Sequence, residues 1–175
     1  MQRPVRILVV AALAALLAGC AADPAAEPTP TPSFSSEAQA FAAAEATYRA
    51  YVDALNQVDL ADPETFEAVY AWTTGELNAG ERQLFTQMHA DGESVTGASS
   101  VQLFLPTTFD KKDISVTADV CLDVSGVDVM DQRGVSLVAA DRVDVQSMRV
   151  RFRPSVDGSV LVLESVSGRD DGPPC

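Results

Sequence analysis

Basic residues are scarce in this chain. It has 12 Lys and Arg against 25 Asp and Glu, which gives a formal net charge of −13, and Lys111 and Lys112 are its only lysines. Binding to nucleic acid depends on clusters of Lys and Arg that release condensed counterions. We therefore expect no nucleic acid partner. The same charge balance opposes adsorption to an anionic membrane surface at short range.

Histidine is the rarest of the residues that commonly act as catalytic bases, and the single one is His89. A hydrolase built on Ser, His and Asp would need it as the base, yet the chain has no glycine-flanked nucleophile motif. A helix is expected to end at Gly92. An imidazolium in the last turn of that helix would complement the negative end of its dipole. We favour this structural role over catalysis.

Long apolar runs are also missing, except near the start. Arg3 and Arg6 precede an apolar run at 7–17, which is followed by Ala18, Gly19 and Cys20. The run is too short for a permanent membrane span of about 20 residues. This order resembles the signal peptide and lipobox of bacterial lipoproteins. The resemblance implies that residues 1–19 are removed and that Cys20 carries a diacylglyceryl group.

The lipobox resemblance also implies a location. Two acyl chains hold a protein firmly on a bilayer, whereas one chain holds it only marginally. We expect an exported protein anchored through Cys20 to the outer face of the cell membrane. Residues 20–35 follow as a tether that contains four prolines among small and polar residues. Such a composition favours extended conformations and buries no core. Thr29 and Thr31 could alternatively accept O-linked sugars.

Cysteine is limited to three residues. With Cys20 assigned to lipid, Cys121 and Cys175 remain in a compartment that permits disulfides. We predict that they are bonded, with two free thiols as the alternative. Only His89 would then be left as a soft metal ligand, which excludes structural zinc. We expect no metal and no cofactor.

The periodicity of residues 36–175 predicts one α+β domain with helices first and strands afterwards. Helices are expected over about 36–57, from Pro63, and from Thr74 to Gly92, the last with Leu77, Leu84, Phe85 and Met88 inward. Alternation then predicts strands around 101–105, 114–125, 148–153 and 159–166, with a hairpin within 127–139. Short connections favour an antiparallel sheet whose apolar face is covered by the helices.

This element order resembles the cone-shaped fold of nuclear transport factor 2 (NTF2) and its SnoaL-like relatives. The resemblance covers about residues 36–166 and rests on the stretch from Phe41 to Leu55 followed by Phe66 and Tyr70. It contains no diagnostic motif. Exported, lipid-anchored members with a late cysteine pair are familiar in high-GC actinobacteria. The fold hosts enzymes, binding modules and dimerisation domains, so the resemblance implies no single function.

The leading hypothesis is a non-catalytic domain that binds a small apolar ligand or another protein of the cell envelope. Four aromatic side chains are expected to line a ligand pocket in the cone: Tyr48, Tyr51, Tyr70 and Trp72. One alternative is a small isomerase or hydrolase that uses Asp53 or Glu67 with Tyr48. Another is a structural dimerisation module. The oligomeric state is left open.

Two charged groups remain on the predicted sheet. Four carboxylates fall in one hairpin region, and hard cations such as calcium prefer oxygen ligands: Asp119, Asp123, Asp128 and Asp131. Their spacing does not match the calcium loop pattern, so we favour turn chemistry.

Alternation also places Cys121 and three arginines on the outer face, with the tail from Arg169 folded over it: Arg149, Arg151 and Arg153. We expect these arginines to form exposed pairs with Asp119 and Asp123.

Overall fold

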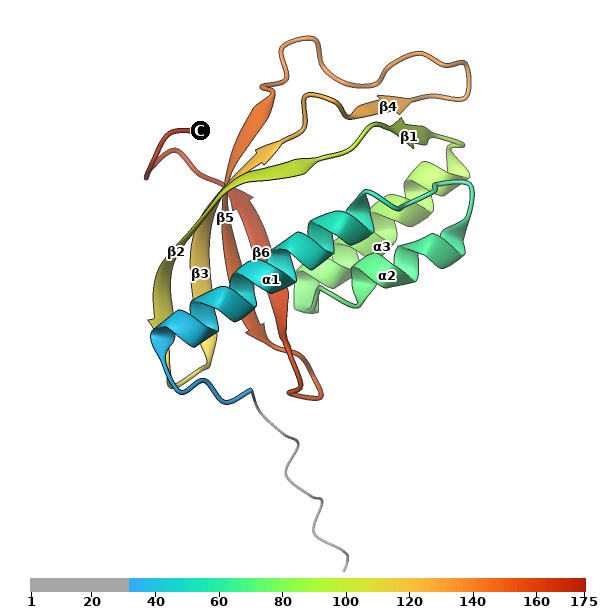
Figure 1. Cartoon of the computed structure of the whole chain (residues 1–175). Helices are drawn as coiled ribbons and strands as arrows, with labels where there is room; N and C mark the ends of the chain where they lie inside the picture. The colour runs from blue at the N-terminus through green and yellow to red at the C-terminus, as the bar shows by residue number, and fades with distance from the viewer. Residues whose placement is uncertain (1–31) are drawn as a thin grey trace, which may run out of the picture.

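The computed structural model describes residues 32–175. Residues 1–31, which contain the predicted signal peptide and Cys20, lie outside the described residues. Helices come first and strands follow (Figure 1). The helical elements are α1 (Glu37–Leu55), η1 (Pro63–Phe66), α2 (Glu67–Tyr70) and α3 (Gly75–Ala90). The strands are β1 (Ser94–Thr96), β2 (Ser100–Asp110), β3 (Ser115–Asp123), β4 (Asp128–Met130), β5 (Val145–Pro154) and β6 (Leu161–Gly168).

Side-chain capping marks the starts of α1 and η1, whereas Thr74 precedes α3 without a side-chain capping bond. The Ser36 side chain accepts a hydrogen bond from the Gln39 backbone N–H, and the Gln39 side chain accepts one from the Ser35 backbone N–H. These contacts satisfy backbone donors at the start of α1. Asp62 caps Glu64 in the same way, with Pro63 at the first position of the turn. That segment begins as a 3-10 turn. Gly92, with φ of +62°, follows the end of α3.

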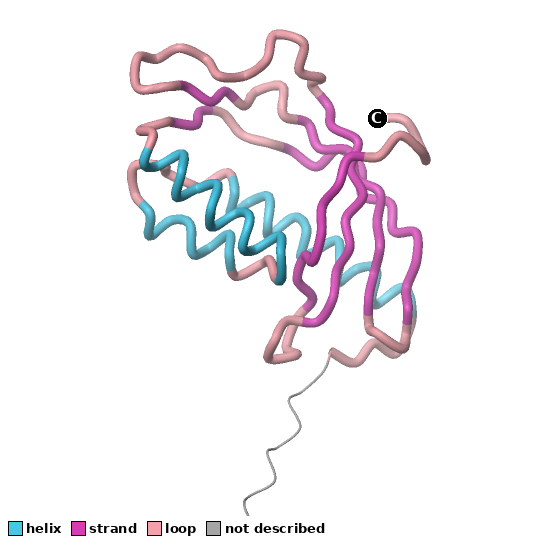
Figure 2. Tube along the Cα trace, turned by 180° about the vertical axis from the view of Figure 1, so that it is seen from behind, coloured by secondary structure: helices cyan, strands magenta, loops and turns pink. Residues whose placement is uncertain are grey.

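Four strands form the main sheet, in the order β2-β3-β5-β6, and every neighbouring pair is antiparallel. The strands bend, and the helical layer covers one face (Figures 1 and 2). Helix α1 contacts β2, β3 and β6, whereas α3 contacts β6. The predicted α+β class, with helices first on a curved antiparallel sheet, is confirmed. The element order and layering are those of the cone-shaped fold that the sequence resembles.

Two hydrophobic clusters make the core. The larger lies between α1 and the sheet and includes Tyr48, Phe152 and Leu163, each at most 1% exposed. The smaller lies among the helices and includes Phe66, Val69 and Phe85. Burial of apolar surface on this scale is the main stabilising contribution to such a fold.

A small ribbon of β1 and β4 stands apart from the main sheet, above the helices (Figure 2). Its register places Val95 opposite Val129. The hairpin turn predicted within 127–139 is present at 131–134, where the Gly134 N–H donates to the Asp131 carbonyl. An antiparallel bridge joins Met130 to Ser136, and the Leu137 N–H donates to the Val129 carbonyl across the turn. The longer pairing of β4 is with β1, which the sequence did not predict.

Among residues 32–175, no helix is both long enough and apolar enough to cross a bilayer.

Candidate functional site

An apolar cleft of about 200 Å³ lies between the helical layer and the β1–β4 ribbon. It is lined by the end of α1 and the loop after it, the C-terminal half of α3, both strands of the ribbon, and the loops at 97–99 and 127. Its lining consists of Leu55, Asn56, Val58, Leu60, Phe85, Met88, Val95, Gly97, Ser99, Val127 and Val129. None of these side chains titrates, so the lining supplies no acid or base.

Hydrogen bonds hold the ribbon over the cleft. The Asn56 side-chain amide donates to the Ser99 carbonyl at 2.9 Å and accepts from the Ser99 N–H at 2.8 Å. Gln132 donates to the Asp91 carbonyl at 2.8 Å, at the end of α3. Gly97 has φ of +82°, and a Cβ there would lie 1.8 Å from the Gly126 carbonyl oxygen. Only glycine fits where these two backbone segments pass each other. Their close contact fixes the loop at 97–99 over the cleft.

The four aromatic residues predicted to line a pocket do not meet around this cleft. Tyr48 is 1% exposed and lies in the core against the sheet, with its ring 6.1 Å from that of Tyr51. Tyr70 belongs to the smaller cluster, where the Arg82 guanidinium stacks 3.9 Å from its ring centre. Trp72 lines a different, open groove beside α1. The tyrosines therefore act mainly as core residues.

A buried acid, Glu81, was missed by the sequence analysis. It is 8% exposed, and each carboxylate oxygen accepts one hydrogen bond: from the Tyr51 hydroxyl at 2.7 Å and from the Thr73 hydroxyl at 2.8 Å. Burial raises the pKa of Glu81, while the two hydrogen bonds act in the opposite direction. Asn78 donates to the Thr73 hydroxyl at 3.0 Å and extends the network. A signal was available, because Glu81 lies four residues from both Leu77 and Phe85.

The two acids considered for catalysis, Asp53 and Glu67, do not lie near Tyr48 in a cavity. Asp53 and Glu67 are exposed, and Glu67 pairs with Arg82 at 3.2 Å. Neither residue lines the cleft. The suggested pairing of either acid with Tyr48 is therefore wrong, because the helix faces that carry the acids point to solvent while Tyr48 points to the sheet.

His89 occupies the last turn of α3, as expected. Its Nδ1 lies 2.6 Å from the Leu60 carbonyl oxygen, and its ring meets Phe66 edge-on. These contacts tie the end of α3 to the loop before η1. The geometry gives His89 a structural position.

The four aspartates considered for calcium are each engaged separately. Asp123 accepts from Ser125 and Gln102, Asp128 accepts from Ser136, and Asp131 binds Arg133. Among residues 32–175, no group of three or more His, Cys, Asp or Glu is placed to hold a metal ion. The turn interpretation fits these contacts.

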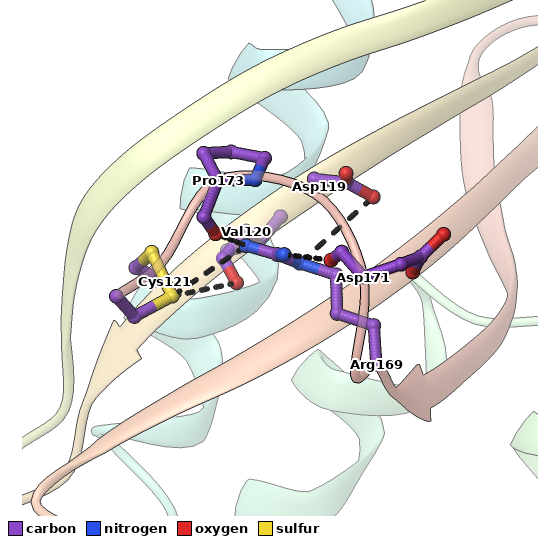
Figure 3. The surroundings of a disulfide bond; sticks show 7 residues. Asp119, Val120, Cys121, Arg169, Asp171 and Pro173 are labelled. Atoms are coloured by element: carbon purple, nitrogen blue, oxygen red, sulfur yellow. Dashed lines mark hydrogen bonds and ion pairs between the residues drawn. A yellow bond between two sulfur atoms is a disulfide. The ribbon is translucent and has the colours of Figure 1, made fainter.

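The C-terminal tail crosses the outer face of the sheet, where a disulfide joins Cys175 to Cys121 of β3 (Figure 3). Beneath the tail lies Asp119, which is 2% exposed and accepts hydrogen bonds from Arg149 at 2.8 and 3.1 Å. These bonds lower the pKa of Asp119. Arg169 donates to the Asp171 and Pro173 carbonyls and holds the tail in place.

This arrangement corrects the expectation of exposed pairs on the outer face. The Asp119 pair is covered because the tail closes over it. Asp123 does not pair with an arginine. Arg151 and Arg153 instead share Glu164 of β6, at 2.9 and 2.7 Å.

No protein-family profile matches the chain, and no curated protein sequence matches it. One similar solved structure is a protein of Novosphingobium aromaticivorans described as a candidate aromatic ring hydroxylase: 15% identity, TM-score 0.48, with 77% of this chain and 96% of that chain covered. Another is Aln2 from a Streptomyces species: 14% identity, TM-score 0.45, with 80% and 94% covered. At these values we derive no activity from either.

Proposed function

We propose that this protein is an exported lipoprotein, anchored through Cys20, whose domain binds a small apolar ligand in the cleft beneath the β1–β4 ribbon without transforming it. The anchor is supported by the order of Arg3, Arg6, the apolar run and Cys20. The observation that carries the binding function is the cleft lining, which is predominantly apolar and contains no titratable side chain.

The size of the cleft limits the ligand. A dry apolar cavity of about 150 Å³ is sufficient for a single aromatic ring. Drug-sized ligands commonly occupy pockets of about 300–1,000 Å³. A cleft of about 200 Å³ therefore suits a molecule of one ring or a short branched chain. The polar pair of Asn56 and Ser99 is already hydrogen-bonded to itself, so apolar contact would supply most of the affinity.

A second candidate is binding of another envelope protein. The loop after β4 exposes three apolar side chains, Val135 by 54%, Leu137 by 52% and Val143 by 65%. Exposed apolar residues that gather on one loop are a feature of interaction surfaces. This loop lies beside the ribbon that covers the cleft (Figure 1).

The proposal is tested by titrating the chain from residue 20 to 175 with toluene and indole. We expect the melting temperature to rise with probe concentration, because a ligand that binds only the folded state stabilises it. Val95→Phe should abolish this rise by filling the cleft. Val156→Phe makes the same change in the β5–β6 turn, outside the cleft, and should leave the rise intact.

Two results would contradict ligand binding in the cleft. One is an equal rise in melting temperature for Val95→Phe and the unaltered chain. The other is conversion of a probe into a product, because the cleft lining offers no group for acid–base chemistry.

A further inference from the structure

The described chain begins at one end of the domain, beside two turns of the main sheet. The segment before α1 lies at the same end as the β2–β3 turn at 111–114 and the β5–β6 turn at 155–160 (Figures 1 and 2). Phe34 meets Phe109, near the end of β2, edge-on with the ring centres 6.0 Å apart. We call this end, formed by residues 32–34, 111–114 and 155–160, the entry end.

Apolar side chains are exposed at the entry end. Val156 is 95% exposed, the largest value among the exposed large apolar residues of the described chain, and Val160 is 45% exposed. Val160 shares an open groove of about 460 Å³ with Pro32, Phe34 and Trp72, and Trp72 is partly exposed there. Apolar side chains that gather at one end of a domain mark an interaction surface.

The charge of the entry end differs from that of the chain as a whole. Lys111 and Lys112, the only lysines, are exposed between Asp110 and Asp113, so the β2–β3 turn has no net charge. Asp157 adds one negative charge in the β5–β6 turn. The two turns together carry two lysines against three aspartates, in a chain whose formal net charge is −13. Repulsion from an anionic surface is therefore weak here.

The length of chain before Pro32 favours one orientation at a membrane. Residues 20–31 precede Pro32, and a fully extended chain of that length spans at most about 40 Å. A globular domain of this size is roughly 35–40 Å across. If Cys20 is anchored, the opposite end can touch the bilayer only with the tether almost fully extended, which costs conformational entropy. The entry end reaches the bilayer without that constraint.

We propose that the entry end rests on the lipid bilayer, with Val156 inserted at the headgroup level and Trp72 close to the interface. This inference rests on the proposed anchor at Cys20 and concerns a surface separate from the cleft. Tryptophan is enriched at membrane–water interfaces, because its ring is apolar while its indole N–H can remain hydrogen-bonded.

The contact orients the domain and does not hold it on the membrane. One inserted valine buries little apolar surface, and the net charge of the chain opposes adsorption of the free protein. A tether keeps the surface at a high local concentration, so a weak contact is still occupied. The β1–β4 ribbon lies at the other end of the domain (Figures 1 and 2). The cleft beneath the ribbon then opens away from the bilayer.

Chemical coupling tests this orientation without natural lipidation. In the chain from residue 20 to 175, Cys121 and Cys175 are bonded to each other, so Cys20 is the only free thiol and couples to maleimide headgroups in phosphatidylcholine vesicles. Trp72 is the only tryptophan, so its fluorescence reports on the entry end. We expect lipids brominated near the headgroup end of the acyl chain to quench this fluorescence.

Two matched variants test the role of Val156. Val156→Asp should remove the quenching, because a carboxylate does not enter the interface without loss of hydration. Val135→Asp makes the same change at an exposed valine in the loop between β4 and β5, at the opposite end, and should leave the quenching intact (Figure 1). Circular dichroism establishes that each variant is folded.

Moving the anchor provides the second arm. Asp141 is exposed in the same loop between β4 and β5. Coupling through Asp141→Cys, in a Cys20→Ser background, should leave Trp72 unquenched, because the entry end then points away from the bilayer. The orientation would be overturned by unquenched Trp72 after coupling at Cys20, by equal quenching for the two anchors, or by equal quenching in the two valine variants. None of these results depends on whether cells acylate Cys20.

Discussion

The hydroxyl of Tyr51 donates a 2.7 Å hydrogen bond to Oε1 of Glu81, and this bond joins α1 to α3 inside the helical layer. Tyr51 also contacts both hydrophobic clusters, so the bond lies at their junction. The second oxygen of Glu81 is occupied by Thr73. With both oxygens engaged by donors, Glu81 is a polar link between helices and is not poised to exchange protons with a ligand.

Tyr51→Phe should destabilise the fold by about 1.5–3 kcal/mol at pH 7, the usual contribution of a hydrogen bond to a charged group. Urea unfolding measures the free energy. Tyr70→Phe is the matched control, because its hydroxyl does not bond to Glu81 and its loss should cost less. The variant should also raise the pKa of Glu81, because the Tyr51 hydrogen bond lowers it. Equal losses in the two variants would exclude this role for Tyr51.

Glu81 should also make stability depend on pH. Its pKa in the folded state is raised from the ordinary 4.5, so the folded state holds the proton more tightly than the unfolded state does. The resulting stabilisation is fully present below about pH 4.5 and is lost as pH rises through the folded pKa. The difference in unfolding free energy between the unaltered chain and Glu81→Gln should therefore decline from pH 4 to neutral pH.

The titration of Glu81 is measured by how the difference in unfolding free energy changes with pH. A part of that difference that does not change with pH reflects hydrogen-bond geometry and not titration. Glu76→Gln makes the same change at an exposed position of α3 and should give a flatter difference. A Glu81→Gln difference that stays constant across this pH range would mean that burial does not perturb the acid.

The buried face of α3 shows the limit of pattern analysis. Leu77, Leu84, Phe85 and Met88 were expected inside, but Leu84 is 54% exposed while Glu81 is buried. Hydrophobic spacing identified the helix and one side of its face. The spacing placed Leu84 inward and Glu81 outward, and the structure has the reverse. Glu81 can be buried because the hydroxyls of Tyr51 and Thr73 donate hydrogen bonds to its carboxylate. Those donors come from elsewhere in the chain, so helical periodicity does not reveal them.

The sheet was easier to predict. Strict alternation along 114–125 placed Val116, Ala118 and Val120 inward, and all three are fully buried. The same period predicted that Asp119 lies on the outer face of the sheet, and it does. It also predicted an exposed side chain, whereas Asp119 is 2% exposed. Asp119 is buried because the C-terminal tail covers it. The disulfide between Cys121 and Cys175, 54 positions apart, holds the tail there. Local pattern specifies the face, and the tertiary fold decides what covers that face.

Removal of the disulfide should destabilise the domain strongly. A link across 54 residues restricts the unfolded chain and stabilises by about 4 kcal/mol in the loop-entropy description. Cys121→Ser, Cys175→Ser and the double variant should lose similar amounts, because each breaks the same link. Cys20→Ser is the control for replacing a cysteine and should leave the unfolding free energy unchanged. A similar loss in the control would show that the effect does not come from the link.

Retention of this protein at a membrane should depend on Cys20. In a bacterial host that processes lipoproteins, the unaltered chain should sediment with membranes, and its mass should show an added diacylglyceryl group. Cys20→Ser should release the protein, because the acidic domain has little attraction for an anionic bilayer and two acyl chains supply the retention. Cys175→Ser serves as the cysteine control and should stay with the membranes. Release of the unaltered chain into the medium, with position 20 unmodified, would exclude the anchor.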